Sequence, residues 1–516
     1  MRVYPLKRII SVTILVSVCL LGGHGHVATA QTLTTLWQFG GGSNGIAPGA
    51  GVVQGSDGNF YGTTVAGGLN GTGTVFLISA AGTLTTLYQF GHQPTDGVSP
   101  YAGLVEGRDG NFYGTTGYGG TNYNSFYRLD EGTVFRISPS GVLTTLWQFG
   151  SSPTDGQFPY AALVQGSDGD FYGTTQNGGA NGCDCGTVFR ITTNGALTVL
   201  WSFGRHTSDG RFPDEALVQG SDGFFYGATF DGGTNTSSNF PSGAGTVYRI
   251  TSAGTLTTLY QFGGRPTDGA GPNTLAQGSD GNFYGTTEYG GTNTSPFAKG
   301  AGTVFRISAA GTLTTLYQFG GQPTDGLEPY QGLVQGSDGY FYGTTYYGGT
   351  NTSSSSPNGA GTVFRIRPAG TLTTLYQFGG VPTDGRYSLG GLVQGSDGSI
   401  YGTTYSGGTN QDAEFYPDGE GTVYKLVVPL NPPANQISAI LLSGTNVLLT
   451  VPSVAGETYQ LQFSNSMTPA NWSNVAGVVV TNSIGSLLTV TNVGGALQLQ
   501  GFYRFDITPS GARPPD

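Results

Sequence analysis

The chain of 516 residues contains 92 Gly, only 9% charged residues and 12% aromatic residues. Disordered chains combine few aromatic residues with high charge, so this composition excludes a disordered protein and favours many short strands joined by tight turns. The chain holds 30 acidic and 19 basic residues, with a net charge of −11. This balance excludes nucleic acid as an expected partner, because phosphate contacts need a basic surface.

Residues 1–30 have the layout of a secretory signal peptide. Arg2, Lys7 and Arg8 precede an apolar run from Ile9 to Leu21, and Ala28-Thr29-Ala30 supplies the small residues of a cleavage site. The run has 13 residues, whereas a membrane-spanning helix needs about 20. No later segment is long and apolar enough to cross a membrane, so we expect a secreted or cell-surface protein with no transmembrane segment after signal cleavage.

Internal repetition dominates residues 33–426. The phrase Gly-Ser-Asp-Gly-x-Phe-Tyr-Gly-Thr-Thr recurs seven times with small variations, at spacings of 52 to 59 residues. Two further phrases, Gly-Thr-Val-Phe-Arg-Ile and Leu-Thr-Thr-Leu-Tyr-Gln-Phe-Gly, also recur seven times. Repeats of this length indicate a solenoid, an array or a propeller. The aspartates of the first phrase are Asp57, Asp109, Asp168, Asp222, Asp280, Asp338 and Asp397.

Each repeat predicts four antiparallel strands. The first is a short Leu-Val-Gln segment, as at Leu333–Gln335, and a Ser-Asp-Gly turn joins it to the second, Phe-Tyr-Gly-Thr-Thr. Asp-Gly between apolar runs is a strong hairpin signal because both residues tolerate positive φ. The third strand is Gly-Thr-Val-Phe-Arg-Ile and the fourth is Leu-Thr-Thr-Leu-Tyr-Gln-Phe, both rich in β-branched and aromatic residues. Four strands in about 57 residues indicate one blade of a β-propeller.

The order of the strands along the chain predicts how the propeller closes. After the signal peptide the chain begins with a lone fourth strand, Leu33–Phe39, and the repeats end with a third strand, Gly421–Leu426. Pairing these two completes the last blade and leaves no unpaired edge. We therefore predict an all-β fold in which residues 31–428 form a seven-bladed β-propeller with a three-plus-one strand closure. The alternative is an open array.

A second domain is predicted after the propeller. Asn431-Pro432-Pro433 marks a linker over residues 429–436. Residues 437–516 lose the repeat and show six short β-rich runs between Ala439 and Ile507. This pattern predicts a small C-terminal β-sandwich.

The repeated phrases resemble a known family. As they stand at Gly278–Thr287, Gly290–Asn293 and Gly300–Ile307, they are similar to the GloVer tandem repeat of bacterial choice-of-anchor tandem-repeat proteins. The resemblance covers Leu33 to Leu426. It implies export and surface display, and it supplies no catalytic residues.

The C-terminal region carries a second resemblance. Gly456–Leu461, Asn471-Trp472 and Phe502–Arg504 are similar to a small β-sandwich module found at the ends of such proteins. The sequence departs from the family at Arg513–Asp516, where no apolar helix with a basic tail occurs. We therefore expect no membrane-sorting anchor.

The loops divide the predicted propeller into two faces. The turns between the first and second strands and between the third and fourth strands are short and nearly invariant, and we call their side the hairpin face. The loops between the second and third strands vary from 8 to 16 residues. Together with the loops that lead from one blade to the next, they form the other side, the long-loop face. Variable loops on a rigid scaffold carry function, so ligand binding is predicted there.

The candidate ligand-binding residues lie on the long-loop face. One set directly precedes the first strand of a blade, near the predicted mouth of the central channel, and differs in chemistry between copies. A second set follows the second strand. Exposed tyrosines beside amides and carboxylates suit sugar binding, because they offer flat apolar faces and hydrogen-bonding groups; the alternative is ordinary packing between blades. The candidates are Tyr101, Tyr160, Asp214, Asn273, Tyr330, Tyr118, Tyr289 and Tyr347.

Two sets of repeated aspartates have structural explanations. Those of the Ser-Asp-Gly hairpins are turn formers, and those of the Pro-Thr-Asp-Gly loops are expected to accept hydrogen bonds from nearby backbone amides. The alternative for the second set is binding of a cation or a sugar hydroxyl. Calcium needs about six to eight oxygen ligands, and one carboxylate per blade does not gather them.

Catalytic and metal-binding patterns are sparse. After the signal peptide only His92 and His206 remain, and no zinc-ligand spacing occurs. Cys183 and Cys185 form either a local disulfide or a reduced pair, with a two-ligand metal site as a further alternative. We expect neither a metal nor a cofactor.

The sequence thus predicts a monomeric, non-catalytic scaffold that binds an extracellular polysaccharide or a cell-surface protein. The alternative is a polysaccharide-active enzyme on the same propeller, either a glycoside hydrolase or a lyase. Asp214, Glu215 and Glu328 near the channel mouth would supply the paired carboxylates of a hydrolase. A tyrosine would supply the base of a lyase.

Overall fold

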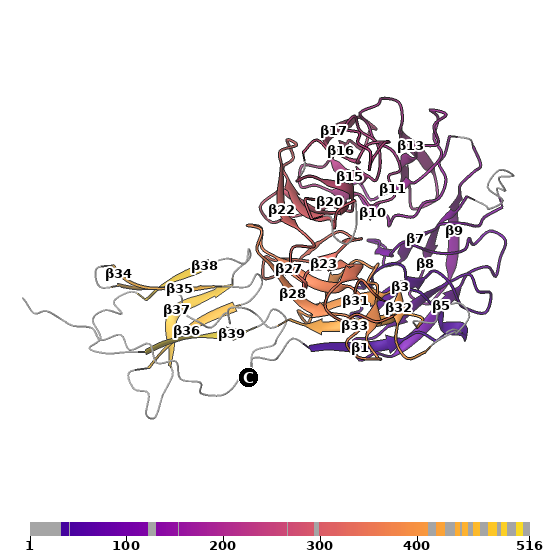
Figure 1. Cartoon of the computed structure of the whole chain (residues 1–516). Coiled ribbons are helices and arrows are strands. Elements are labelled where there is room, and N and C mark those ends of the chain that lie inside the picture. The colour runs from indigo at the N-terminus through magenta and orange to yellow at the C-terminus, as the bar shows by residue number, and fades with distance from the viewer. Residues whose placement is uncertain are drawn as a thin grey trace, which may run out of the picture. The chain divides into compact units, whose positions relative to one another are not determined.

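The structure is a computed structural model of the whole chain (Figure 1). It describes residues 32–428 apart from 41, 122–130, 153, 266, 294–298, 355 and 411–418, and six strands beyond residue 428. The predicted signal peptide and linker lie outside the described residues. The chain divides into two compact units. One is Gln31–Gly336 with Tyr340–Val428, and the other contains Met1–Ala30, Ser337–Gly339 and Pro429–Asp516.

The first unit is a seven-bladed β-propeller, and each blade is an antiparallel sheet of the four predicted strands. The first strands are β2 (Val53–Gln54), β6 (Val105–Glu106), β10 (Val164–Gln165), β14 (Val218–Gln219), β19 (Ala276–Gln277), β24 (Val334–Gln335) and β30 (Val393–Gln394). The second strands are β3 (Phe60–Thr64), β7 (Phe112–Thr116), β11 (Phe171–Thr175), β15 (Phe225–Thr229), β20 (Phe283–Gly290), β25 (Phe341–Thr345) and β31 (Ile400–Thr404).

The outer half of each blade consists of the two longer repeated phrases. The third strands are β4 (Thr74–Ile78), β8 (Thr133–Ile137), β12 (Thr187–Ile191), β16 (Thr246–Ile250), β21 (Thr303–Ile307), β27 (Thr362–Ile366) and β33 (Thr422–Val427). The fourth strands are β5 (Leu84–Gln89), β9 (Leu143–Gln148), β13 (Leu197–Ser202), β17 (Leu256–Gln261), β22 (Leu313–Gln318), β28 (Leu372–Gln377) and β1 (Thr32–Gln38). A single turn of 3-10 helix, η1 (Gly42–Asn44), follows β1.

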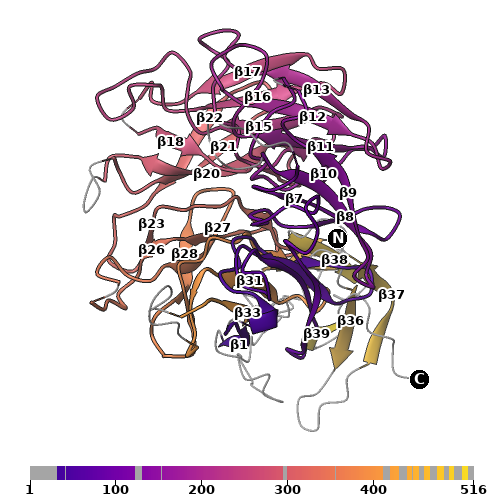
Figure 2. The same ribbon diagram turned by 90° about the vertical axis from the view of Figure 1, so that its right-hand side faces the viewer.

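Strand β1 closes the ring. It pairs antiparallel with β33, with Leu33 opposite Leu426, so the last blade has the order β30-β31-β33-β1. Figures 1 and 2 show this indigo N-terminal strand beside the orange end of the repeat region. Phe39, directly after β1, is fully buried and packs edge to face against Phe76 of the first blade, with ring centroids 5.4 Å apart. The predicted three-plus-one closure is confirmed.

Two layers of aromatic contacts join neighbouring blades. The tyrosine of one second strand stacks on the phenylalanine of the next, as Tyr172 does on Phe225 with centroids 3.9 Å apart. The junction between the sixth and seventh blades has Ile400 in place of the phenylalanine. In the second layer, the phenylalanine after each fourth strand meets a third-strand ring of the next blade edge to face, as Phe149 meets Phe189 at 5.4 Å. Such pairs stabilise by about 0.5–1.5 kcal/mol beyond their buried area, which explains why the repeat retains these rings.

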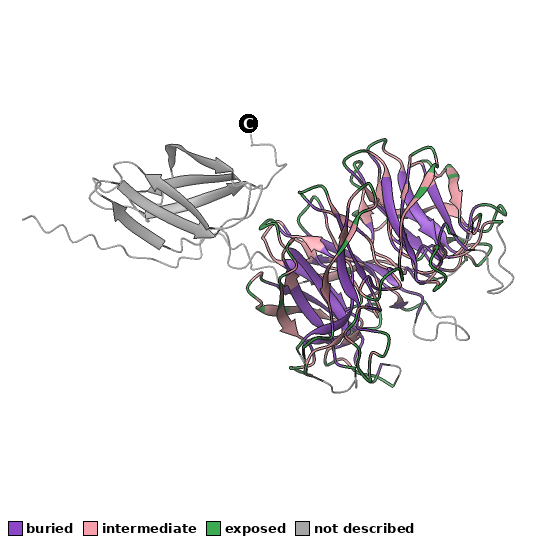
Figure 3. Cartoon of the chain, turned by 90° about the horizontal axis from the view of Figure 1, so that it is seen from above, coloured by how far each residue is buried: buried purple, intermediate pink, exposed green. Residues whose placement is uncertain are grey.

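The hydrophobic core follows the second and third strands. The first five residues of every second strand are buried, and the third strands are nearly fully buried (Figure 3). Their buried threonines pair across the sheet, as Thr175 Oγ1 and Thr187 Oγ1 do at 2.8 Å. In Figure 3 the exposed residues gather in the loops. The blades therefore form a rigid frame whose variable parts are the loops.

The long-loop face contains short strands that the sequence did not predict. β18 (Gly269–Pro272) pairs with β20, β23 (Gly326–Leu327) with β26 (Tyr347–Gly348), and β29 (Gly385–Arg386) with β32 (Ser406–Gly407). Other blades have a single bridge at the same place, such as Val98 with Tyr118. The segment that enters a blade is thus tied to the segment that leaves its second strand. Glycine-rich pieces this short have no strand periodicity and therefore resemble loops in sequence.

The second unit contains two three-stranded antiparallel sheets. Their orders are β34-β35-β38 and β37-β36-β39. The bounds are β34 (Ala439–Ser443), β35 (Asn446–Pro452), β36 (Thr458–Ser464), β37 (Ser473–Thr481), β38 (Leu487–Asn492) and β39 (Phe502–Thr508). Across both units, none of the described residues belongs to a helix long and apolar enough to span a membrane.

Candidate functional site

Seven equivalent residues stand where the chain enters each blade on the long-loop face, and we call them the entrance residues. All have positive φ, between 52° and 63°. A side chain makes this left-handed conformation unfavourable by about 1–2 kcal/mol. A following proline restricts the backbone further at six of the seven positions, and Ser388 follows Tyr387. Six of the seven nevertheless carry a side chain, and these six side chains are of five different types. They are Ala47, Ser99, Phe158, Phe212, Gly271, Glu328 and Tyr387.

Backbone hydrogen bonds to two blades hold the entrance residues in place. Phe158 N donates to Glu131 O of the preceding blade at 3.0 Å, and Phe158 O accepts from Gln176 N of its own blade at 3.0 Å. The next residue, Pro159, lies against Gly132 at the start of the preceding third strand, where a Cβ would be 2.7 Å from the proline Cδ. This contact and a φ of +95° explain the glycine of the Gly-Thr-Val phrase.

One aromatic cluster covers the second and third blades on this face. Tyr101 is 37% exposed and meets the ring of Tyr160 edge to face, with centroids 5.2 Å apart. Tyr160 Oη donates a hydrogen bond to Tyr118 Oη at 2.7 Å. Phe158 lies next to Tyr118, with centroids 5.6 Å apart. The structure thus brings together three of the predicted tyrosines with one entrance residue.

A second aromatic cluster lies at the sixth and seventh blades. Tyr330, which is 39% exposed, lies beside Tyr346 with centroids 5.8 Å apart. Tyr346 also stacks on the entrance residue Tyr387 at 4.9 Å and meets Tyr347 at 4.6 Å. Tyr387 Oη and Ser356 Oγ are hydrogen bonded at 2.8 Å. Two predicted tyrosines, Tyr330 and Tyr347, therefore belong to one four-ring group.

Carboxyl groups from the fourth to sixth blades act on one another next to Tyr330. Burial raises the pKa of Asp214, and burial together with the charge of Asp214 raises the pKa of Glu215. Burial and the charges of Glu328 and Asp214 raise the pKa of Glu288 to about 7. Burial and the charges of Glu288, Asp214 and Glu215 also raise the pKa of Tyr330. The sequence placed Asp214, Glu215 and Glu328 near the mouth but not Glu288, which lies in β20 at a position where the other repeats have no acidic residue.

The hydrogen bonds of this acidic region are few. Glu215 Oε2 accepts from Thr274 N at 3.1 Å and from Thr274 Oγ1 at 2.5 Å. Asp214 Oδ2 accepts from Gln176 Nε2 at 3.3 Å, while its buried Oδ1 has no partner among the described residues. Such an unpaired buried oxygen favours the protonated carboxyl.

Asn273 differs from the other candidates because it is 3% exposed. Its side-chain amide donates to Thr286 Oγ1 at 2.8 Å and to Pro329 O at 2.6 Å. These bonds tie the fifth blade to the loop that enters the sixth. They give Asn273 a packing role.

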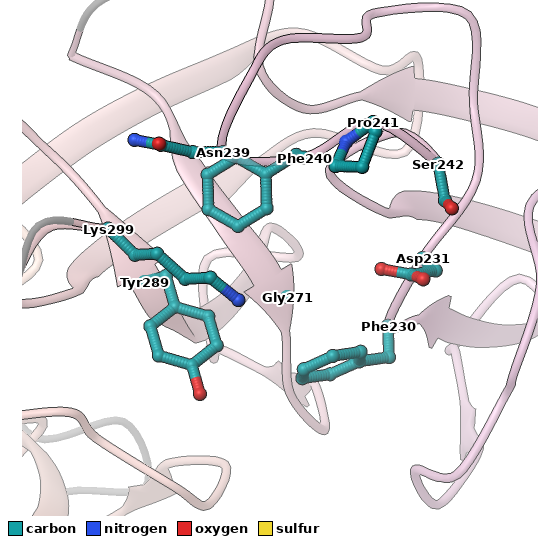
Figure 4. Close-up of a pocket in the computed structure, with 9 residues that line it drawn as sticks. All are labelled: Phe230, Asp231, Asn239, Phe240, Pro241, Ser242, Gly271, Tyr289 and Lys299. Carbon is teal, nitrogen blue, oxygen red and sulfur yellow. The ribbon is translucent and has the colours of Figure 1, made fainter.

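Tyr289 lines a cavity of about 230 Å³ between the fourth and fifth blades (Figure 4). Its walls include Phe230 and Phe240, and Figure 4 shows Lys299 and Asp231 on opposite sides. Apart from Tyr289, the sequence did not identify these residues. They come from loops that differ in length and composition between blades, so no repeat pattern marks them.

The repeated aspartates serve as structural acceptors. Asp57 accepts hydrogen bonds from Asn59 N at 3.0 Å and Tyr61 Oη at 2.9 Å. Burial alone would raise the pKa of Asp57, but hydrogen bonds from Asn59 and Tyr61 together lower it. In the entry loops, buried Asp96 accepts from Tyr88 Oη at 2.6 Å. The same tyrosine-to-loop bond recurs at Asp268, Asp325 and Asp384.

The remaining candidates concern sulfur and metals. The structure places Cys183 and Cys185 as a disulfide with Cα atoms 5.2 Å apart. Among the residues that the structure describes, no group of three or more His, Cys, Asp or Glu side chains is arranged to hold a metal ion.

The fold and the site define a seven-bladed β-propeller that presents a varied aromatic and acidic face on an invariant frame. A model of the Gloeobacter/Verrucomicrobia repeat matches residues 26–131, 127–295 and 234–430. The chain belongs to this repeat family, which confirms the resemblance of its repeated phrases. No curated protein matches the chain.

Several solved structures show a partial likeness to this chain. The extracellular domain of a protein described as a hybrid two-component system from B. thetaiotaomicron is 12% identical with a TM-score of 0.48; the match covers 90% of this chain but only 55% of that one. A protein described as an oxidoreductase (glucose dehydrogenase) from Thermus thermophilus is 16% identical with a TM-score of 0.37, covering 64% and 96%. A puromycin hydrolase is 13% identical with a TM-score of 0.45, covering 80% and 60%.

Proposed function

We propose that this protein is an exported, non-catalytic propeller that binds an extracellular glycan through its long-loop face. The entrance residues are the observation that carries the proposal. Six of them keep a side chain at a φ where glycine would be unstrained. Backbone strain at variable positions of an otherwise uniform frame is typical of sites that contact a ligand.

The tyrosine clusters support a glycan as the ligand. Tyr101 and Tyr330 are partly exposed, and each belongs to a group of rings that fixes its orientation. A fixed and exposed ring offers a flat apolar surface to a sugar without a large loss of side-chain entropy. Carboxyl and hydroxyl groups beside the rings would bind sugar hydroxyls.

A glycan array with the purified chain, followed by titration of the strongest glycan, tests this proposal. Tyr101→Ala and Tyr330→Ala should each weaken binding by about 1 kcal/mol, and adding Tyr160→Ala should abolish it. Val142→Ala is the matched control, because Val142 is an apolar side chain on the hairpin face with 67% exposure. Full binding by the triple variant would show that these tyrosines do not contact the glycan. Loss of folding would show that they pack between blades instead.

A second candidate function rests on the raised carboxyl pKa values. A glycoside hydrolase needs one protonated and one ionised carboxyl. The charge of Asp214 raises the pKa of Glu215, which favours a protonated Glu215 beside an ionised Asp214. New reducing ends in a polysaccharide digest, formed without the unsaturated sugar that β-elimination leaves and lost in Glu215→Gln, would establish hydrolysis. Binding without new reducing ends would favour the scaffold.

Export and domain organisation belong to the same proposal. The sequence of residues 1–30 supports cleavage of a signal peptide and a secreted or cell-surface location for a monomer. We also propose that the two sheets of residues 437–516 pack as a β-sandwich joined by the linker 429–436. Mass spectrometry of the exported chain should find Gln31 at its N-terminus.

A further inference from the structure

The disulfide of the third blade lies in the loop between β11 and β12, on the long-loop face. Its two sulfur atoms differ in access, because Cys183 is exposed whereas Cys185 is only 1% exposed. In thiol–disulfide exchange a thiolate attacks one sulfur and expels the other. A thiolate that approaches from solvent therefore reaches Cys183 Sγ, and Cys185 Sγ is the leaving group.

The frame of the propeller does not require cysteines at these positions. Counted back from the Gly-Thr-Val phrase, Ser242 and Ala244 of the fourth blade stand where the third blade has Cys183 and Cys185. Ala244 is 1% exposed, which equals the exposure of Cys185. A small apolar side chain thus fills the buried position, and a serine is accepted at the exposed one.

Hydrogen bonds hold this loop independently of the disulfide. The side-chain amide of Asn181 donates to Ser202 O at 2.7 Å and to Phe203 O at 3.0 Å. Asn351 makes the same pair of hydrogen bonds in the sixth blade, where the loop contains no cysteine. The cysteines are two residues apart, and the stabilisation that a disulfide provides grows with the length of the loop it closes. The disulfide is therefore a poor structural cross-link.

The residue between the cysteines has an unfavourable backbone conformation. Asp184 has a φ of 55°, and the equivalent residues of the fourth to sixth blades are Gly243, Gly300 and Gly359, all with positive φ. Glycine adopts this conformation without strain, whereas a residue with a side chain does not. The frame and the disulfide both hold Asp184 there, so opening the disulfide removes one of two constraints. This effect favours the reduced pair.

We propose that Cys183 and Cys185 form a thiol-exchange site that accepts two electrons from thiols at the long-loop face. A thiolate attacks Cys183 Sγ and forms a mixed disulfide, while the bond between the two cysteines breaks and its electron pair leaves on Cys185 Sγ. A second thiolate attacks the outer sulfur of the mixed disulfide and expels Cys183 as a thiolate. Two thiols become one disulfide, and their protons pass to the cysteine pair. The site does not depend on glycan binding by the tyrosines.

Equilibration of the native full chain with glutathione, at graded ratios of the reduced to the oxidised form, tests the proposal. Acid quenching, alkylation of free thiols under denaturing conditions and mass spectrometry then give the fraction of reduced pairs. We expect half reduction at a ratio within the series, with the circular dichroism of the native fold retained. Structural disulfides of secreted proteins resist reduction by glutathione, whereas exposed ones are labile.

Two results of this equilibration would overturn the site. One is a pair that stays oxidised at every glutathione ratio and opens only with dithiothreitol, which would make the disulfide structural. The other is a pair that is reduced at every ratio, which would make it a dithiol that does not exchange.

Two single variants test which sulfur is attacked. Cys185→Ala leaves the exposed Cys183 thiol, and Cys183→Ser leaves the buried Cys185 thiol. With oxidised glutathione at equal concentration, Cys185→Ala should form its mixed disulfide about tenfold faster or more, because exchange requires access to the sulfur. Equal rates, or a faster reaction of Cys183→Ser, would contradict attack at Cys183.

The double variant Cys183→Ser/Cys185→Ala tests whether the disulfide is a structural cross-link. It reproduces Ser242 and Ala244 of the fourth blade, so its urea midpoint should equal that of the wild type. It should take up no glutathione at any ratio. A clearly lower midpoint would show that the disulfide stabilises the blade and would overturn the argument that the frame does not need it.

Discussion

Replacing Phe39 by alanine tests whether the first strand closes the propeller. Phe39 follows β1, is fully buried, and meets Phe76 across the junction between the last and first blades. Phe149 occupies the same position inside the ring, is 1% exposed, and meets Phe189 at the same centroid distance of 5.4 Å. Truncating a buried phenylalanine to alanine destabilises a protein by about 3–5 kcal/mol. A closed ring therefore predicts nearly equal losses for Phe39→Ala and Phe149→Ala.

Urea unfolding followed by tryptophan fluorescence and far-UV circular dichroism measures both losses. Each variant should have a lower urea midpoint with an unchanged slope of the transition. The two losses in free energy of unfolding should agree within about 1 kcal/mol. A fall for Phe149→Ala with no fall for Phe39→Ala would refute closure by β1. In that case the N-terminal strand would be detached from the cooperative unit, and the last blade would have three strands.

Three further predictions concern single groups. Tyr248→Phe should raise the free energy of unfolding by about 1 kcal/mol, because the buried Tyr248 hydroxyl has no partner among the described residues; equal or lower stability in urea would show that the hydroxyl is satisfied. Glu288 is more easily protonated in the folded chain than in the unfolded chain, so its contribution to stability is present at low pH and is lost as the pH rises through about 7. Glu288→Gln should therefore gain stability over wild type as the pH rises to alkaline values, by an amount on the order of 3 kcal/mol, and parallel pH profiles of the two proteins would contradict this. Alkylation of the unreduced exported chain under denaturing conditions should label neither Cys183 nor Cys185, and labelling of both would establish a reduced pair.

The blades could be predicted from the sequence because each repeat contains local signals for every strand and turn. Asp-Gly marks a hairpin within a few residues, and the positions of Leu33 and Gly421 alone define the closure. The aromatic layers also follow from the repeat, since Tyr172 and its equivalents face the same neighbour at each junction. Because the strand and turn signals of each repeat agree with one another and recur in every copy, the fold can be predicted from the sequence.

The site could be predicted only in part, because its residues meet across blades. Tyr101, Tyr118 and Tyr160 were assigned to one face, but their mutual contact depends on the rotation between two blades. The positive φ of Glu328 or Tyr387 has no signal in the sequence, because glycine marks such a position only at Gly271. The electrostatic interaction of Asp214 with Glu288 joins an entry loop of one repeat to the second strand of the next. Asn273 was predicted to bind ligand, but its amide is hydrogen bonded to Thr286 and Pro329 within the protein. Nothing in its repeat indicates these hydrogen bonds.

Hydrogen–deuterium exchange with and without a bound glycan tests the binding face most directly. A bound glycan should slow exchange in the peptides that carry the entrance residues and the loops after the second strands, around Tyr101, Phe158 and Tyr330. The hairpin peptides around Asp57 and Asp280 should exchange at the same rate in both states. Protection confined to the hairpin face, or to residues 437–516, would contradict the claim that the long-loop face binds the ligand.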